Sequence, residues 1–150
     1  MTAKKSNFTY MKKIVAFFFV FVLFSCASNS SKKTKPLFEI LTEQNNGGAS
    51  IQFYEILTEE KEIKMLLNDD NLKRKVKPED IKTANFIILN LGEKNSGGYS
   101  VKVENIQETE NQVILTVKEI KPKAGEPVID VMSNPYTIVK INSKKEIVIK

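Results

Sequence analysis

Apolar and polar residues alternate along two stretches in the second half of the chain, and this pattern constrains the fold more than any other. The alternation runs through residues 99–106 and again through residues 112–120. A period of two is typical of β-strands with one buried face and one exposed face. The polar residues 107–111 separate the two stretches, so we expect them to form a β-hairpin.

Other segments extend this prediction to a whole domain. Residues 86–91 are almost continuously apolar, which is typical of a central strand covered on both faces. Residues 58–68 instead have helical spacing, with Thr58 as a possible N-cap and acidic residues in the first turn. We therefore expect a mainly β (α+β) fold, an antiparallel β-sandwich or roll of about seven to eight strands with this single helix. The remaining strands are expected at residues 37–41, 50–54, 128–131, 136–141 and 146–149.

The first part of the chain has the composition of a targeting segment. An unbroken apolar run of 11 residues, 14–24, follows the short basic segment 11–13. The run is shorter than the roughly 20 residues that a transmembrane helix needs, and its order of basic and apolar parts is typical of a secretory signal peptide. We interpret residues 1–25 as such a peptide, with a buried core helix or an uncleaved anchor as alternatives. Translation starts at Met1 or at Met11, because the second site already has a complete basic segment.

The residues that follow the apolar run form a recognisable motif. Leu23-Phe24-Ser25-Cys26 resembles a bacterial lipobox, although Phe24 is bulkier than the usual residue. The resemblance implies that the chain is cut before Cys26 and that its thiol is diacylated. Two or more acyl chains provide a stable membrane anchor. The alternative is that Cys26, the only Cys in the chain, is a small apolar residue or a free thiol.

A polar tether separates the lipobox from the folded part. Residues 26–36 carry no large apolar side chain, so we expect a flexible segment, followed by a single globular domain at residues 37–150. Ala27 stands where many bacterial lipoproteins retained at the inner membrane have Asp. We therefore expect the chain in the bacterial cell envelope, anchored through Cys26 to the outer membrane and facing the periplasm.

Composition excludes several classes of function. The chain has no His, so Ser–His–Asp triads, Cys–His pairs and His metal sites are impossible. We expect no metal and no cofactor. The net charge is +5, but four lysines without any acidic residue precede residue 26, and the remainder is close to neutral. A nucleic-acid-binding domain would need a basic surface, so we expect no nucleic-acid partner.

Catalysis by carboxylates alone is also unfavourable. The adjacent pairs Asp69-Asp70 and Glu79-Asp80 lie in polar segments. Glycoside hydrolysis needs two carboxyl groups that face each other across a cleft, one of them desolvated. Neighbours in a solvated loop do not provide that geometry, so we expect no enzymatic activity.

Two glycine-containing segments resemble each other. Residues 45–51 and 95–101 each carry a Gly pair after an apolar stretch and before an alternating one. Paired glycines between strands allow tight turns. We expect either two ordinary hairpins or a duplicated hairpin.

Five residues are candidates for protein-binding loops. Gly97 and Gly98 lie between two expected strands and Tyr99 begins the second of them, whereas Pro135 and Tyr136 open a later strand. Loops at one end of a rigid sandwich are natural binding surfaces. The alternative is that the glycines serve the turn and both tyrosines fill the core.

An ordered set of motifs runs through the last part of the chain: an apolar strand led by Phe86, Gly92, residues 96–101, Val117, residues 122–125 and residues 135–139. This set resembles the C-terminal domain of the PrcB family of protease-complex subunits and covers residues 85–150. Asn85 departs from it, because an Asp is expected before the Phe. The resemblance implies an envelope lipoprotein that assembles with a protease complex, or stabilises it, without cleaving peptides.

Three functions are compatible with these features. The first is a binding or assembly subunit that holds a protease through β-strand edges and the candidate loops. The second is a protease inhibitor that presents the five loop residues close together at one end of a β-sandwich. The third is a structural lipoprotein that binds cell-wall or outer-membrane components.

Overall fold

The computed structural model describes residues 35–150. The expected signal peptide at residues 1–25, the lipobox and the acylated Cys26 lie outside these residues and stay predictions. Between residues 35 and 150, no helix combines the length and the apolar character that crossing a membrane requires.

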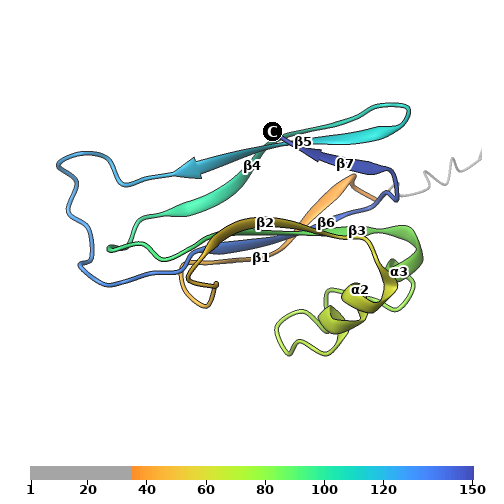
Figure 1. Ribbon diagram of the computed structural model, residues 1–150, viewed down its shortest axis with the longest axis horizontal. Coiled ribbons are helices and arrows are strands. Elements are labelled where there is room, and N and C mark those ends of the chain that lie inside the picture. Colours follow the sequence, from red (N-terminus) through yellow and green to blue (C-terminus); the bar gives the residue numbers. More distant parts are fainter. Residues whose placement is uncertain (1–34) are drawn as a thin grey trace, which may run out of the picture. The chain divides into compact units, whose positions relative to one another are not determined.

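Strands dominate this part of the chain (Figure 1). Seven strands and two short helices are present within residues 35–150, which confirms the expected mainly β architecture. The elements are β1 (Phe38–Gln44), β2 (Gln52–Leu57), α2 (Glu60–Leu67), α3 (Asp80–Thr83), β3 (Asn85–Leu91), β4 (Ser100–Glu108), β5 (Gln112–Ile120), β6 (Tyr136–Ile141) and β7 (Glu146–Ile149).

The strands form two sheets that stack face to face (Figure 1). The four-stranded sheet has the order β1-β6-β3-β2 and is antiparallel throughout. The three-stranded sheet has the order β4-β5-β7. Its β4–β5 pair is the hairpin that the alternating pattern predicts, but β7 pairs with β5 in parallel. A parallel neighbour leaves no local signal in the sequence, and we did not expect it.

The four-stranded sheet is covered on both faces, which explains the continuous apolar sequence of β3. Ile87, Leu89 and Leu91 point into the inter-sheet cluster, the hydrophobic core between the two sheets. Phe86 points the other way, into the helical-side cluster. Because successive side chains of a strand point to opposite faces, a strand buried on both faces is apolar at nearly every position.

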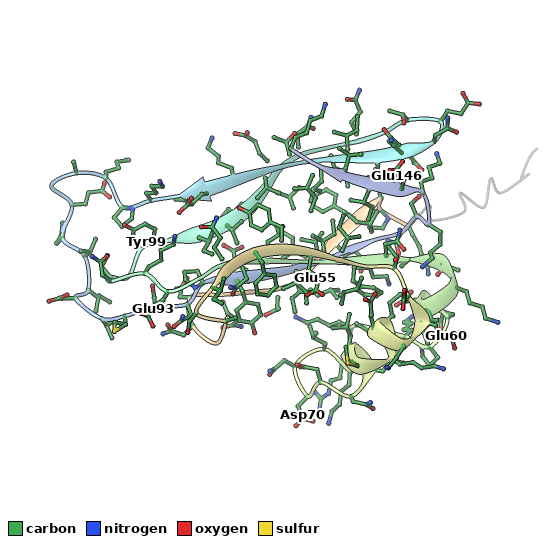
Figure 2. All side chains as sticks on the ribbon, viewed as in Figure 1. Glu55, Glu60, Asp70, Glu93, Tyr99 and Glu146 are labelled. Atoms are coloured by element: carbon green, nitrogen blue, oxygen red, sulfur yellow. The ribbon has the colours of Figure 1, made fainter. Side chains whose placement is uncertain are left out.

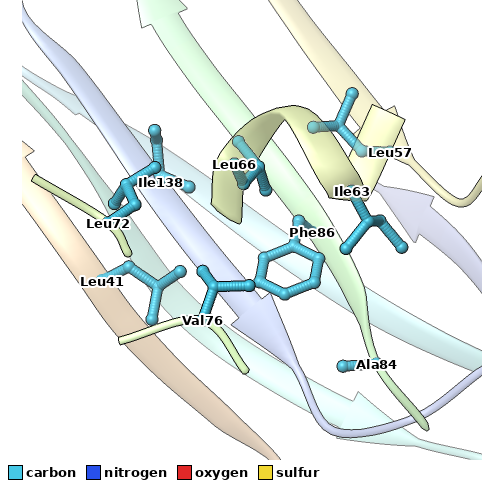
Figure 3. Packing of buried hydrophobic residues seen from close by; sticks show 9 residues of the cluster. All are labelled: Leu41, Leu57, Ile63, Leu66, Leu72, Val76, Ala84, Phe86 and Ile138. Atoms are coloured by element: carbon cyan, nitrogen blue, oxygen red, sulfur yellow. The ribbon is translucent and has the colours of Figure 1, made fainter. Parts of the chain in front are cut away.

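The helical-side cluster joins α2, α3 and their connection to the sheet (Figure 3). Ile63 and Leu66 of α2 pack there, as their helical spacing predicts. The N-cap lies one residue later than expected: it is Glu59, in place of Thr58. The carboxylate of Glu62, the third residue of the helix, accepts hydrogen bonds of 3.1 Å from the N–H groups of both Thr58 and Glu59, as in a capping box.

Neither glycine-containing segment is a hairpin, so that expectation is wrong. Residues 45–51 connect β1 to β2, which lie at opposite edges of the four-stranded sheet. Residues 92–99 connect β3 to β4 and pass from one sheet to the other. Paired glycines fit any sharp turn, and β6 later fills the place beside β3 that a hairpin partner would occupy.

The strand expected at residues 128–131 is also absent. These residues belong to the long connection between β5 and β6, and their side chains are exposed. Alternating apolar residues form a strand only where a neighbouring strand offers pairing. Within residues 121–135, the only β-type pairing is the single bridge between Ser133 and Lys94.

Candidate protein-binding loops

Gly97 and Gly98 lie against the connection between β5 and β6. The Gly97 N–H donates a hydrogen bond of 2.9 Å to the carbonyl of Ile129. Gly98 has a φ of 89°, and a Cβ atom at this position would come within 2.9 Å of Cγ of Pro122. Both the backbone conformation and the close approach therefore require glycine at residue 98.

Further contacts join the same two connections. Lys94 and Ser133 exchange backbone hydrogen bonds of 2.8 and 2.9 Å. The Ser133 hydroxyl donates to the carbonyl of Ser96 at 2.8 Å. We call residues 92–99 and 121–135 the paired loops, because these contacts hold them side by side at one end of the sheets (Figure 1).

The two candidate tyrosines lie on opposite faces of the four-stranded sheet. Tyr99, directly before β4 (Figure 2), packs against the inter-sheet cluster, and Nζ of Lys94 lies 5.6 Å from its ring centroid. Tyr136 packs against the helical-side cluster. Pro135 is buried, and its carbonyl accepts the N–H of Leu91 at 3.0 Å. The structure thus brings Gly97, Gly98 and Tyr99 together but does not place the Tyr136 ring with them.

The paired loops carry exposed apolar side chains that our sequence analysis assigned to a strand. Ile129 is 74% exposed, and Val128, Val131 and Met132 are also exposed. We call these four residues the apolar strip. Clustered exposed apolar residues mark interaction surfaces more often than isolated ones do. A usable signal was present in the sequence, because Pro122, Gly125 and Pro127 precede the strip and favour a loop.

A cavity of about 230 Å³ opens on the helical side of the four-stranded sheet. Its walls include Phe53, Ile88, Tyr136 and Ile138, and Asp69 contributes the one carboxylate. Asn90 also lines it, but its side chain is occupied by hydrogen bonds to the backbone of Ala49 and Ile51. Asn90 therefore offers no free polar group to a ligand in this cavity, whereas Thr42, Asp69 and Asn71 add polar atoms to its walls.

Three of the four adjacent carboxylates considered for catalysis, Asp69, Asp70 and Asp80, have structural partners. Asp80 is fully buried and pairs with Lys140 of β6 at 2.8 Å. Asp69 accepts hydrogen bonds from the N–H groups of Asn71 and Leu72 at 2.8 and 3.2 Å, and thereby shapes the turn after α2. Asp70 pairs with Lys73 at 2.7 Å. No group of three potential metal ligands occurs within residues 35–150.

Comparison with known families decides what this arrangement belongs to. Residues 85–142 match the family model described as PrcB C-terminal. The chain carries a PrcB C-terminal domain. This domain indicates a subunit associated with a protease complex. Searches of curated proteins and of solved structures return no significant match.

The PrcB C-terminal domain runs from the first residue of β3 to the residue after β6 and contains both paired loops. The match ends at residue 142, eight residues earlier than the resemblance in the sequence. The edge strands β1 and β2 lie outside the match but pair with β6 and β3 of the PrcB domain. The four-stranded sheet is therefore built jointly by the PrcB domain and the preceding residues.

Proposed function

We propose that this chain is a non-catalytic, lipid-anchored lipoprotein of the bacterial cell envelope that binds a protease as a subunit of its complex. The match of residues 85–142 to the PrcB C-terminal family carries this proposal. Acylation of Cys26 would hold the protein at the outer membrane, on its periplasmic face. The function requires no metal and no cofactor, and neither a nucleic acid nor a small substrate.

The apolar strip supports binding through the paired loops. Its four side chains lie within the PrcB match and are presented to solvent by a connection that hydrogen bonds hold in place. A preorganised loop loses little conformational entropy when it binds. A protein partner that buried Ile129 and its neighbours would gain the transfer free energy of apolar surface.

The test is recovery of the partner from solubilised envelopes after mild crosslinking, with a tag at the C-terminus and identification by mass spectrometry. We expect a single protease in near-stoichiometric amount. Activity of that protease in the eluate would identify a helper subunit, whereas loss of activity would identify an inhibitor. Recovery of only abundant outer-membrane proteins or wall fragments would contradict the protease-subunit role and favour a structural role.

A matched pair of variants locates the contact. Ile129→Lys places a charge in the apolar strip, and we expect it to lower protease recovery by about tenfold or more, as substitutions at interface centres do. Met65→Lys is the control, because Met65 is 62% exposed but lies on α2, outside the PrcB match. Equal recovery with both variants would show that the strip is not the contact.

A further inference from the structure

The outer side of β2 is an open sheet edge. The N–H of Leu91 donates a hydrogen bond to the carbonyl of Pro135, next to β6. Because backbone groups alternate in direction along an antiparallel strand, those of Ile87, Leu89 and Leu91 point toward β6. The backbone groups of the residues between them point toward β2. Phe53 and Glu55 pair with Asn90 and Ile88, and their backbone groups therefore point toward β3. By the same alternation, Tyr54 and Ile56 direct their N–H and C=O groups away from the sheet.

Side chains leave this edge accessible. Gln52 through Glu55 are all exposed, and the rings of Phe53 and Tyr54 are 37% and 38% exposed. The β2–β3 register is continuous from Gln52 to Leu57, without a bulge, and the strand carries no basic residue. Lysines, bulges and covering groups are the usual devices that protect an edge, and β2 has none of them.

The other edges of the described sheets are protected. In β1, a bulge falls between Ile40 and Thr42, and the Lys75 ammonium donates to the carbonyl of Leu41. In β4, the register shifts between Val103 and Asn105, and the strand carries Lys102. The remaining edge strand, β7, has only four residues. Because three edges are protected and β2 is not, β2 is the edge suited to strand addition.

Charge indicates which segment would fit. Glu55 lies on β2 (Figure 2), and no salt bridge within residues 35–150 involves it. On the other face, burial raises the pKa of the Tyr54 hydroxyl, and the nearby Glu119 carboxylate raises it further. Glu119 itself pairs with Lys94 at 3.4 Å, so the carboxylate without a salt bridge at this edge is Glu55. A second copy of β2 would bring Glu55 near its own counterpart, whereas basic residues would be attracted.

We propose that β2 accepts an extended segment of a partner protein, in which apolar residues alternate with lysine or arginine, as an added strand. The segment would exchange backbone hydrogen bonds with Tyr54 and Ile56 and place a basic side chain beside Glu55. This inference rests on one part of the proposed function, namely that the chain binds a protein partner. It adds a contact outside the PrcB match, on the strand next to β3.

The test uses the full chain in detergent and two short capped peptides, one alternating valine with lysine and one alternating valine with glutamate. Amide hydrogen exchange reports where each binds. We expect the lysine peptide to slow exchange at Tyr54 and Ile56 and the glutamate peptide to leave it unchanged. Equal protection by both peptides, protection only at the paired loops, or sedimentation that shows self-association through β2 would overturn the proposal.

Variants separate backbone pairing from other contacts. Tyr54→Pro removes an outward N–H without breaking a bond to β3, and we expect about tenfold weaker peptide binding. Tyr54→Thr keeps the N–H and is the control for loss of the ring. Glu55→Lys should weaken the lysine peptide by about fivefold through cross-strand repulsion. Glu110→Lys, in the β4–β5 turn, makes the same change in net charge but should not weaken binding of the lysine peptide.

The two proposals fail in different ways. If the wild-type chain recovers a protease from envelopes and Tyr54→Pro and Glu55→Lys both recover it equally well, strand addition is wrong and the subunit role stands. If no protease is recovered but the lysine peptide still protects Tyr54, the subunit role is wrong and β2 remains a binding edge. Glu55→Lys keeps the test decisive if the Pro variant does not fold.

Discussion

Gly98 and Gly125 both lie in the left-handed region of backbone conformation, with φ values of 89° and 84°, but their surroundings differ. A Cβ atom at Gly98 would meet the ring of Pro122, whereas a Cβ atom at Gly125 would have no atom within 4 Å. The pair therefore separates the cost of a left-handed backbone from the cost of a close approach. Of these two glycines, only Gly98 lets the paired loops approach closely, because it has no side chain.

We predict that Gly98→Ala lowers the free energy of unfolding by more than Gly125→Ala does. Both variants share the penalty of about 1–2 kcal/mol for a left-handed alanine. Gly98→Ala adds an overpacking cost of about 1–3 kcal/mol, since a proline ring cannot rotate away. Denaturant titration of the two variants measures the difference, and equal losses would mean that the paired loops separate freely at Pro122.

At the scale of elements, α2 is held to the sheet by one face. Leu66 is 8% exposed and packs in the helical-side cluster, whereas its neighbour Met65 is 62% exposed. A helix of eight residues is too short to be stable alone in water, so packing of this face must supply its stability. The Glu62 carboxylate, which accepts the N–H groups that precede the helix, adds a smaller contribution.

We predict that Leu66→Ala lowers the free energy of unfolding by about 2–5 kcal/mol, because it removes buried methyl groups and leaves a cavity. Met65→Ala is the matched control on the same helix and should change it by less than about 0.5 kcal/mol. Thermal unfolding followed by circular dichroism compares the two. Similar effects from both would mean that α2 does not dock on the sheet through Leu66.

Local patterns in the sequence predicted the elements that depend on local contacts. The alternation around Val101 and Leu115 identified β4 and β5, and the apolar run led by Phe86 identified a strand covered on both faces. Pairing between distant strands was not predictable in this way. The parallel β5–β7 pair and the two crossing connections depend on which strands become neighbours, and alternation in one segment does not encode that choice.

The candidate site was predictable to a similar extent. Gly97 and Gly98 were identified as a turn, because glycine pairs mark sharp changes of direction. Tyr136 was grouped with them because Pro135 opens a strand, yet the parity of β6 turns its ring to the helical side. Ile129 was missed because alternation suggests a strand even where no neighbouring strand is available.

At the scale of the whole molecule, the four-stranded sheet ties the described domain together. Its two faces carry the helical-side and inter-sheet clusters, so both cores share β3 and β6. Loss of one cluster would expose one face of β3 and β6 to solvent and so weaken the sheet on which the other cluster packs. The described residues begin at the end of the expected polar tether, and the proposed anchor would act on the domain as one unit.

We predict that Cys26→Ser abolishes metabolic incorporation of palmitate and leaves the protein uncleaved or released from the membrane. The serine hydroxyl that replaces the thiol cannot form the thioether through which a lipobox Cys is acylated. Labelling with radioactive palmitate and fractionation of the envelope measure both effects. Normal labelling of the variant would end the lipoprotein assignment, whereas the fold of residues 35–150 would be unaffected by either result.

The position of β6 also determines when this chain can fold. β6 lies between β1 and β3 in space but follows both along the chain, so the four-stranded sheet is incomplete until residue 141 has been synthesised. The three-stranded sheet waits longer, for β7. Contacts between such distant segments slow folding, because long loops must close first. If the expected signal peptide directs export through a narrow channel, this delay is useful, since the nascent protein remains unfolded and threadable until almost all of it has been made.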